Sequence, residues 1–328
     1  MAVTIDGLGV PDVLILANSE IVQRRVLPAL AAAGVERVDI ASRRAAGGIA
    51  RPAGLAGRDF QDYAKAIEVS SAPLVWISTV NSLHAELASA ALDSGRDVIV
   101  DKPATTDPGA TLRLVEKARA AGRLLAEATV FSYHPQIAAI RGAFDAAGSA
   151  PRHIVAAFSY PQLPQHNFRH HPSLGGGSLL DLGPYAVALG RLFFEAMPER
   201  VACEALPDDA GFSLLMRYPG ERTVTGHFGT MSGYVNRATL VGPDVTVDID
   251  RLFTTAPDAP ASISARVRNA HWPVTVRAAD SFRHFVDAVL DARAGIGMER
   301  FRSDMAADAR VFGLLRAAAS NGSAAAGQ

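Results

Sequence analysis

The 328-residue sequence has one cysteine, few aromatic residues and almost no net charge. A single cysteine, Cys203, excludes an intramolecular disulfide and a cysteine-cluster metal site. The 32 basic and 33 acidic side chains give a formal charge of −1, which argues against a broad nucleic-acid-binding surface. Aromatic residues make up only 7% of the chain, but hydrophobic residues make up 49%, which is enough for the cores of two domains.

The sequence also lacks any uninterrupted apolar run of about 18 residues, the length that a membrane-spanning helix needs. The short run from Val10 to Ala17 contains Asp12 and follows no basic segment, so it predicts a strand and not a signal peptide. We therefore expect a cytoplasmic protein with no membrane and no nucleic-acid partner.

Strand-like and helix-like segments alternate through the first third of the chain. Strands are predicted at residues 13–16, 37–41, 74–78, 97–100 and 124–128, and helices at 21–33, 84–92 and 108–121. Such alternation is typical of an α/β domain with a doubly wound parallel sheet. We predict that this first domain covers residues 1–130.

Beyond residue 130 the strands mostly follow one another without helices between them. Strands are predicted at 152–160, 200–205, 211–218, 222–229, 234–241 and 245–250, and helices at 136–146, 180–193, 281–294 and 302–319. Consecutive strands favour an antiparallel sheet, so the second domain, residues 131–319, is predicted to be α+β. Residues 320–328 are small and polar and are predicted to be a disordered tail.

The first strand-to-helix turn contains no glycine. A dinucleotide-binding turn normally has glycines where this chain has Ala17, Ser19 and Val22, because they let the backbone approach the pyrophosphate. Ala17 still permits a tight turn if its φ stays negative, but the Ser19 side chain crowds the approach and Glu20 adds negative charge. The turn alone leaves open whether a dinucleotide binds. The residues that would contact it are Ala17, Asn18, Ser19, Glu20 and Ile21.

The end of the second predicted strand carries Ser42, Arg43 and Arg44. In an NAD-binding domain an acidic residue at this place binds the ribose 2′-hydroxyl. A hydroxyl and two guanidinium groups suit a 2′-phosphate instead, which predicts NADP(H) in preference to NAD(H). The alternative interpretation is a solvated basic loop.

Two further segments carry candidate catalytic side chains. Lys102 ends a predicted strand within the motif D-K-P, at the sheet edge where ligands bind, and a lysine there can donate a proton to a substrate oxygen. The glycine-rich segment 175–185 places Asp181 and Tyr185 four residues apart, on one face of a predicted helix. The alternative is a glycine loop and helix cap with Tyr185 in the core.

In combination these motifs resemble the Gfo/Idh/MocA oxidoreductase family. The D-K-P motif stands where the family usually has Glu-Lys-Pro, segment 81–85 (N-S-L-H-A) resembles a family loop, and segment 175–185 is close to G-G-G-x-L-x-D-x-G-x-[HY]. The resemblance covers about residues 12–290. It implies an N-terminal Rossmann domain and a C-terminal α+β domain built on a large, mostly antiparallel open sheet. That sheet often forms the oligomer interface in the family, so a homodimer or homotetramer is expected.

Within the family, segments 20–29, 41–43, 101–107 and 250–257 are most similar to ketoreductases that act on nucleotide-linked sugars in deoxysugar pathways, especially 3-ketoreductases. The similarity implies an NADPH-dependent enzyme that reduces a keto group of a nucleotide-linked sugar. One alternative is a dehydrogenase of a free sugar, polyol or related cyclic alcohol. Another is a cofactor-poor, non-catalytic family member that acts as a binding subunit.

The resemblance also implies roles for individual residues. Lys102 and Tyr185 would face the reacting carbonyl and supply the proton, with Asp181 orienting the substrate or joining their hydrogen-bond network. The remaining cofactor contacts implied are Thr79, Asn81, His84, Asp101 and Lys102. His84 is expected to be a structural loop residue that contacts the cofactor rather than a base.

Other candidate substrate contacts lie in the second domain. Arg169 suits a substrate phosphate, and it equally suits an exposed loop. Tyr234 and Asn236 are assigned to the substrate, although alternation along a strand explains them equally well. The pair of histidines at 170–171 has no acidic ligand nearby in the sequence, so no metal is expected.

Overall fold

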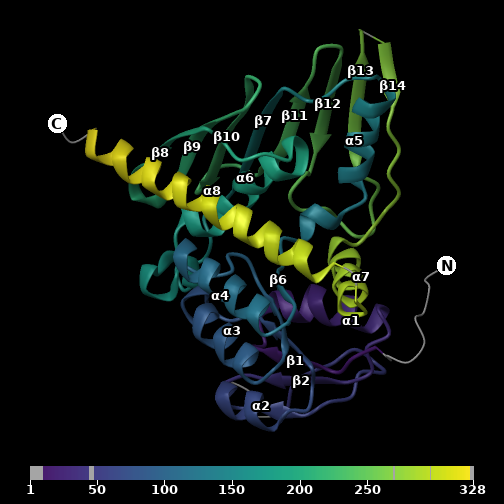
Figure 1. Ribbon diagram of the computed structural model, residues 1–328, viewed down its shortest axis with the longest axis vertical. Coiled ribbons are helices and arrows are strands. Elements are labelled where there is room, and N and C mark those ends of the chain that lie inside the picture. Colours follow the sequence, from purple (N-terminus) through teal and green to yellow (C-terminus); the bar gives the residue numbers. More distant parts are fainter. Residues whose placement is uncertain (1–9, 44–47, 269, 296, 326–328) are drawn as a thin grey trace. The chain divides into compact units, whose positions relative to one another are not determined.

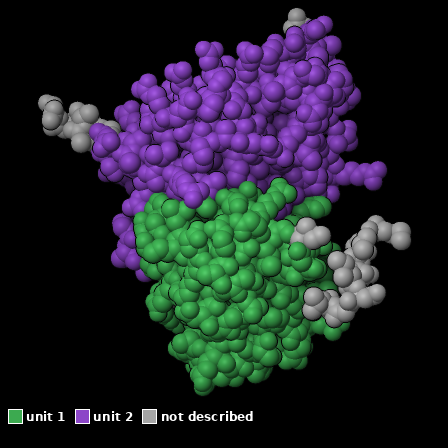
Figure 2. All heavy atoms as spheres, viewed as in Figure 1, with its two compact units in different colours: residues 1–128, 282–306 green, residues 129–281, 307–328 purple. Residues whose placement is uncertain are grey.

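The computed structural model describes residues 10–43, 48–268, 270–295 and 297–325. The chain forms two compact units, coloured green and purple in Figure 2. Unit 1 comprises residues 1–128 and 282–306, and unit 2 comprises residues 129–281 and 307–328. Within the described residues, every helix is too short or too polar to cross a lipid bilayer.

Unit 1 is built on a parallel sheet with the strand order β3-β2-β1-β4-β5-β6, of which β1, β2 and β6 are labelled in Figure 1. Its strands are β1 (Val13–Leu16), β2 (Val38–Ala41), β3 (Asp59–Phe60), β4 (Leu74–Ile77), β5 (Asp97–Val100) and β6 (Leu125–Glu127). All residues of β1, β2, β4 and β5 are buried, as expected when helices cover both faces of a parallel sheet. The predicted doubly wound Rossmann sheet is confirmed.

The helices of unit 1 follow its strands. A π-helical turn (Val22–Val26) leads into α1 (Leu27–Ala32), and a 3₁₀ turn (Asn81–Leu83) leads into α3 (His84–Asp93). Helices α2 (Tyr63–Val69) and α4 (Pro108–Ala120) begin at aspartate caps, where Asp62 and Asp107 accept hydrogen bonds from backbone N–H groups of the first turn. These caps explain where the two helices start.

Residues 282–306, which the sequence placed with the second domain, belong to unit 1. They contain most of α7 (Ser281–Arg293) and the start of α8 (Met298–Ala325). The ring of Phe285 lies 5.8 Å from the ring of buried Trp76.

Helix α8 continues through Ala325, where the sequence predicted disorder from residue 320. Residues 320–323 are Ser-Asn-Gly-Ser, which have low helix propensity, so the composition of this segment did not predict the longer helix.

Unit 2 is built on a mostly antiparallel sheet with the strand order β14-β13-β12-β11-β7-β10-β9-β8, in which only the β7–β10 pair among the described strands is parallel. Its strands are β7 (His153–Tyr160), β8 (Arg200–Ala205), β9 (Gly211–Tyr218), β10 (Arg222–Thr230), β11 (Val235–Val241), β12 (Val245–Asp250), β13 (Ser262–Val267) and β14 (Ala270–Pro273). The predicted large open sheet is confirmed, and β13 and β14 extend it beyond the strands expected from the sequence.

Helices cover one face of this sheet. They are α5 (Gln136–Ala146), α6 (Ser178–Phe194) and the later part of α8. Helix α6 carries two glycines where other parts of the unit come close. A Cβ at Gly190 would overlap the Tyr218 ring, and a Cβ at Gly183 would overlap the Phe312 ring. These close approaches fix the position of α6, which bears Asp181 and Tyr185.

Candidate functional site

The first turn of unit 1 has a backbone geometry that normally requires glycine. Ala17 has a φ of +103°, whereas the sequence reasoning allowed a tight turn there with negative φ. In this region the Cβ of an L-residue is crowded by its own backbone. The Ala17 N–H donates a hydrogen bond to the Ala41 carbonyl at 2.8 Å, which holds the residue in place.

Ser19 stands at the start of the following helix. Its Oγ accepts a hydrogen bond from the Val22 N–H at 3.3 Å and lies 2.9 Å from the Ser78 Oγ. A hydroxyl in this position satisfies one of the N–H groups that a helix start otherwise offers to an anion. The serine therefore does more than crowd the turn, because it joins the turn to the end of β4.

The Ser19–Ser78 contact continues to the lysine motif at the end of β5. Ser78 donates to one carboxylate oxygen of Asp101 at 2.6 Å, and the Trp76 indole N–H donates to the other at 2.8 Å. Both Asp101 oxygens are therefore engaged by unit 1 itself. Asp101 was expected to contact the cofactor, but its carboxylate anchors the strand end from which half-buried Lys102 follows.

Two further contacts hold the lysine motif. The Glu127 carboxylate accepts the Ala104 N–H at 2.6 Å. The two ring nitrogens of His84 lie 2.9 Å from the Pro103 carbonyl oxygen and 3.2 Å from the Thr79 carbonyl oxygen. Complete burial lowers the pKa of His84, although these contacts partly oppose the shift. The structural role expected for His84 fits this geometry, because both ring nitrogens face backbone carbonyls, and its contact with the cofactor stays a prediction.

Other residues that were expected to contact the cofactor at this sheet edge also interact with neighbouring residues of the protein. The Thr79 hydroxyl donates to the Val80 carbonyl at 3.2 Å, and Asn81 is buried at the start of its 3₁₀ turn. Glu20 forms an exposed ion pair with Arg24 at 2.7 Å, which partly offsets the negative charge that the sequence places beside the turn. Ile21 is exposed on the same turn.

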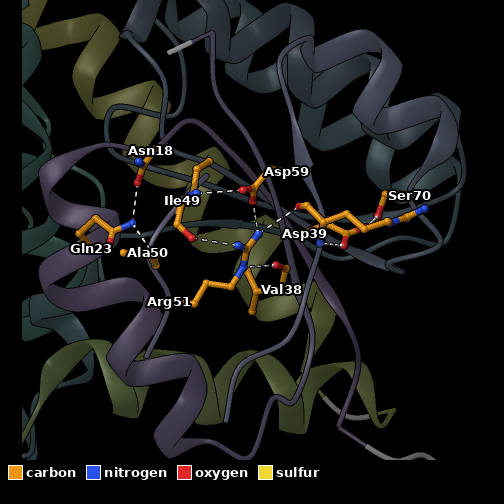
Figure 3. A network of polar contacts seen from close by, with 10 residues as sticks. Asn18, Gln23, Val38, Asp39, Ile49, Ala50, Arg51, Asp59 and Ser70 are labelled. Carbon is orange, nitrogen blue, oxygen red and sulfur yellow. Dashed lines mark hydrogen bonds and ion pairs between the residues drawn. The ribbon is translucent and has the colours of Figure 1, made fainter. Parts of the chain in front are cut away.

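Side-chain hydrogen bonds join the first turn to the loop after β2 (Figure 3). The Gln23 amide donates to the Asn18 side-chain oxygen at 2.6 Å and to the Ala50 carbonyl at 3.2 Å. Asn18 is therefore held by the protein, and Gln23, which the sequence reasoning missed, links the two loops. The positions of Asn18, Gln23 and Ala50 in the sequence gave no indication that these residues contact one another.

The same loop is braced by Arg51, as Figure 3 shows. Its guanidinium donates to the carbonyls of Val38 and Ile49, each at 3.0 Å, and pairs with Asp59 at 2.5 Å. The Asp59 carboxylate also accepts the Ile49 N–H at 2.9 Å. These bonds fix where the chain returns to the sheet after the Ser42–Arg43 segment.

Ser42 and Arg43 follow directly after β2. Ser42 is buried, and its N–H donates to the Phe60 carbonyl at 2.8 Å. The exposed Arg43 lies over the ring of Tyr63, with its guanidinium carbon 5.4 Å from the ring centre. Arg44, the third residue of the predicted phosphate site, lies outside the described residues.

The glycine run in unit 2 leads into α6. A Cβ at Gly176 would come within 2.6 Å of the Phe168 carbonyl oxygen, and Gly177 has a φ of +120°. Ser178, the first residue of the helix, donates its N–H to the carboxylate of Asp209 at 2.9 Å and its hydroxyl at 2.7 Å. The helix start is therefore pinned by a residue from the loop between β8 and β9.

Three segments of unit 2 converge on the carboxylate of Asp181. The Tyr160 hydroxyl donates to one Asp181 oxygen at 2.5 Å, and the Arg169 Nε lies 3.0 Å from the other. Arg169 was left between a substrate contact and an exposed loop, and the structure places it in this ion pair. Tyr160 was missed, because the last residue of a strand carries no sequence signal for such a contact.

The ring of Tyr185 lies in an aromatic cluster. Its centre is 5.0 Å from that of Phe158 and 5.6 Å from those of Phe131 and Phe253. Contacts of this kind restrict the ring's rotation. Tyr185 is partly buried and lies one helical turn beyond Asp181 on α6. The predicted shared face of Asp181 and Tyr185 is therefore present.

Asn236 and Tyr234 lie beside segment 251–254. Asn236 is only 3% exposed, and its amide donates to the Thr254 hydroxyl at 2.7 Å and accepts the Phe253 N–H at 2.9 Å. These bonds anchor the segment, and the substrate contact expected for Asn236 stays a prediction. Tyr234 is half exposed, its hydroxyl lies 3.1 Å from that of Thr254, and Arg251 lies over its ring.

A pocket of about 140 Å³ opens beside the Asp181 carboxylate. Its lining includes Tyr160, Arg169, Asp181 and the two aspartates of segment 208–209. Among the described residues, no group of three or more histidine, cysteine or acidic side chains is arranged to hold a metal ion. Lys102 and Tyr185, the two predicted catalytic residues, belong to units 1 and 2 respectively.

Comparison with known proteins identifies the family. Residues 20–129 match the model for the NAD-binding Rossmann fold of an oxidoreductase family, and residues 148–248 match the GFO/IDH/MocA C-terminal domain. A dTDP-3,4-didehydro-2,6-dideoxy-alpha-D-glucose 3-reductase from Actinomadura kijaniata is 31% identical over 248 residues, covering 73% of this chain and 74% of that protein. The chain belongs to the Gfo/Idh/MocA oxidoreductase family.

Other members of the Gfo/Idh/MocA family are also similar. A D-xylose 1-dehydrogenase (NADP(+)) from Haloferax volcanii is 28% identical over 285 residues, covering 84% of this chain and 86% of that protein. The crystal structure of a 3-ketoreductase from Actinomadura kijaniata, in complex with NADP and TDP-benzene, superposes with a TM-score of 0.84. It is 26% identical and covers 94% of this chain and 98% of that one.

Proposed function

We propose that this protein is an NADPH-dependent oxidoreductase that reduces a keto group of a nucleotide-linked deoxysugar. The observation that carries the proposal is the arrangement on α6, where Asp181 is held by two partners one turn before Tyr185. The similarity to a dTDP-sugar 3-reductase and to a 3-ketoreductase crystallised with NADP supports both the cofactor and the substrate class.

The residues at the end of β2 fit a cofactor with a 2′-phosphate. Ser42 and Arg43 supply a hydroxyl and a guanidinium, whereas a carboxylate at this place would suit a 2′-hydroxyl. The turn from Ala17 to Ile21, which follows β1, would hold the pyrophosphate, and Lys102 follows β5, two strands away in the same sheet. A bound nicotinamide dinucleotide supplies the hydride that reduces the keto carbon.

Reduction of a carbonyl also requires a proton at its oxygen. We assign that donation to the Tyr185 hydroxyl, because its ring is held in a fixed orientation by Phe158 and Phe253. Lys102 is assigned to stabilise the negative charge that develops on the same oxygen. Asp181 orients the substrate hydroxyls or the hydrogen-bond network beside Tyr185.

Separate titrations of the purified protein with NADPH and NADH test the cofactor assignment. Tight binding of NADPH and weak binding of NADH are expected. The proposal is overturned if neither dinucleotide binds at millimolar concentration.

The xylose dehydrogenase among the relatives favours one alternative, oxidation of a free sugar with NADP⁺. The two candidates are separated by measuring kcat/KM for D-xylose with NADP⁺ and for a dTDP-linked 3-keto sugar with NADPH. A higher value for the dTDP-linked sugar supports the proposal, and a higher value for D-xylose supports the alternative.

We also propose that unit 2 forms a homodimer or homotetramer through the face of its sheet opposite α6. Val155 is 55% exposed and Leu215 is 46% exposed. Thr225 is the register partner of both, and Thr239 extends the row on the other side of Val155. An exposed row of this kind is typical of an interface. Light scattering after gel filtration should give an oligomer for the wild type and a smaller species for Val155→Glu, and a monomeric wild type contradicts the proposal.

A further inference from the structure

We propose that Tyr160 is a positioning residue of the active site. Together with Arg169 it holds the Asp181 carboxylate in one orientation and one charge state, and this fixes the surroundings of the Tyr185 hydroxyl. These three residues, Tyr160, Asp181 and Arg169, are called the Asp181 clamp. The proposal rests on the proposed function for the role of Tyr185, but the clamp itself is tested separately below.

The clamp is assembled from three separate structural elements. Tyr160 ends β7, Arg169 lies in the 3₁₀ turn Phe168–His170, and Asp181 lies in the first turn of α6. Each segment is held independently of the carboxylate. Tyr160 pairs with Thr230 in the sheet, and the Arg169 guanidinium lies over the Phe168 ring. The carboxylate is therefore bound between preplaced partners.

The Asp181 side chain is only 11% exposed, so its charge needs partners. The Tyr160 hydroxyl and the Arg169 Nε each take one of its oxygens. Burial disfavours the charged form of Arg169, but the ion pair with Asp181 outweighs it, and the pKa of Arg169 is raised. The Asp181 carboxylate is thus paired with the permanent positive charge of Arg169 and accepts a hydrogen bond from the neutral hydroxyl of Tyr160.

The Tyr160 hydroxyl is engaged with the Asp181 carboxylate, so the proton donation is not assigned to it. Burial raises the pKa of its hydroxyl far above the ordinary value, and the negative charge of Asp181 raises it further. The hydroxyl therefore keeps its proton and serves as a fixed hydrogen-bond donor to Asp181. Its ring faces that of Phe158, which also contacts the ring of Tyr185.

The Asp181 clamp sets the electrostatic environment of the Tyr185 hydroxyl. Tyr185 interacts electrostatically with both Tyr160 and Arg169. When Tyr185 gives up its proton, a nearby Asp181 charge opposes the step and the Arg169 charge favours it. The other titratable groups on the pocket are His170, Asp208 and Asp209, and Asp209 is engaged at the start of α6.

Tyr160→Phe removes the hydroxyl and keeps the ring. Because a hydroxyl donor stabilises the ionised carboxylate, its loss raises the pKa of Asp181. With NADPH and a dTDP-linked keto sugar, kcat at neutral pH should fall by about 10- to 100-fold, the range expected for a lost hydrogen bond to a charged group. The acid limb of the kcat–pH profile should move to higher pH, while the Kd for NADPH stays within about twofold.

Tyr218→Phe is the matched control, because it removes a phenol hydroxyl from the buried core of the same unit, where its neighbour is the Met216 sulfur at 3.6 Å. Its kcat and its pH profile should match those of the wild type. If Tyr160→Phe leaves kcat unchanged, or lowers it equally at every pH, the positioning role is refuted. If Tyr160→Phe does not fold, Arg169→Gln tests the same clamp, since loss of the cation also moves the acid limb to higher pH.

A second measurement needs no substrate and separates the clamp from the proposed function. The Tyr160–Asp181 hydrogen bond stabilises the ionised carboxylate. Its contribution to the stability of the fold is therefore present above the unfolded-state pKa of aspartate and is lost as Asp181 is protonated. The urea midpoints of wild type and Tyr160→Phe should therefore differ at pH 7 and converge as the pH falls progressively below about 4, the unfolded-state pKa of aspartate. A pH-independent difference contradicts the clamp. Convergence without any ketoreductase activity in the wild type supports the clamp and contradicts the proposed function.

Discussion

Ala17 is the residue at which a single substitution should stabilise this protein. Its φ of +103° lies where only glycine is free of strain, and it stands at the first glycine position of a dinucleotide-binding turn. Ala17→Gly removes the Cβ that causes the strain. The Ala17 N–H bond to the Ala41 carbonyl is a backbone contact and is retained.

The size of the effect follows from two opposing contributions. Relief of the left-handed geometry favours the folded state by about 1–2 kcal/mol. The greater freedom of glycine in the unfolded chain opposes it by about 0.5–1 kcal/mol. The net expectation is a gain of about 0.5–1 kcal/mol for unit 1, and with a typical urea dependence the midpoint rises by about 0.2–0.5 M.

Ala31→Gly in α1 is the matched control. Ala31 is also half-buried in unit 1, but it lies inside a helix, so the same substitution should cost about 0.5–1 kcal/mol. Both variants lose one methyl group and gain the same freedom in the unfolded chain. The difference between them, about 1–2 kcal/mol, isolates the strain at Ala17.

Urea unfolding followed by tryptophan fluorescence measures the difference. The chain has two tryptophans, and Trp76 is fully buried in unit 1. Placing all variants in a Trp272→Phe background leaves Trp76 as the reporter of unit 1. If Ala17→Gly lowers the midpoint as much as Ala31→Gly does, the strain at Ala17 is refuted.

Four further substitutions test the site. Tyr185→Phe and Lys102→Ala should each lower kcat by about 10²- to 10⁴-fold while NADPH still binds, and wild-type turnover in both excludes them from the chemistry. Arg43→Ala should weaken NADPH binding by about tenfold and leave NADH binding unchanged, as isothermal titration will show, and an equal loss for both contradicts a 2′-phosphate site. Asp209→Ala should destabilise unit 2 by about 1 kcal/mol in urea unfolding because it uncaps α6, and an unchanged midpoint argues against the cap at Ser178.

The sheets were predictable because burial leaves a direct pattern in the sequence. The apolar run Val13–Leu16 predicts a strand buried on both faces, and the structure buries all of it. Helix α7 shows the limit of such patterns. An amphipathic segment indicates that one face is buried, but not which partner covers it, so the contact of Phe285 with Trp76 was not predictable.

The site was only partly predictable for a related reason. Asp181 and Tyr185 lie on one helix, so their spacing alone placed them on one face. Tyr160 and Arg169 reach Asp181 from other segments, and their contacts depend on tertiary structure that no local pattern records. The bond of Asn236 to the loop at Phe253 was not predicted, because a polar residue on a strand gives no indication of which group it contacts.

The proposed ketoreductase activity is measured by the rate at which the purified protein consumes NADPH in the presence of dTDP-3,4-didehydro-2,6-dideoxy-D-glucose. We expect consumption that depends on both protein and sugar, with a kcat/KM at least about tenfold higher for NADPH than for NADH. Saturating NADPH binding with no consumption above the protein-free rate would contradict the proposed activity.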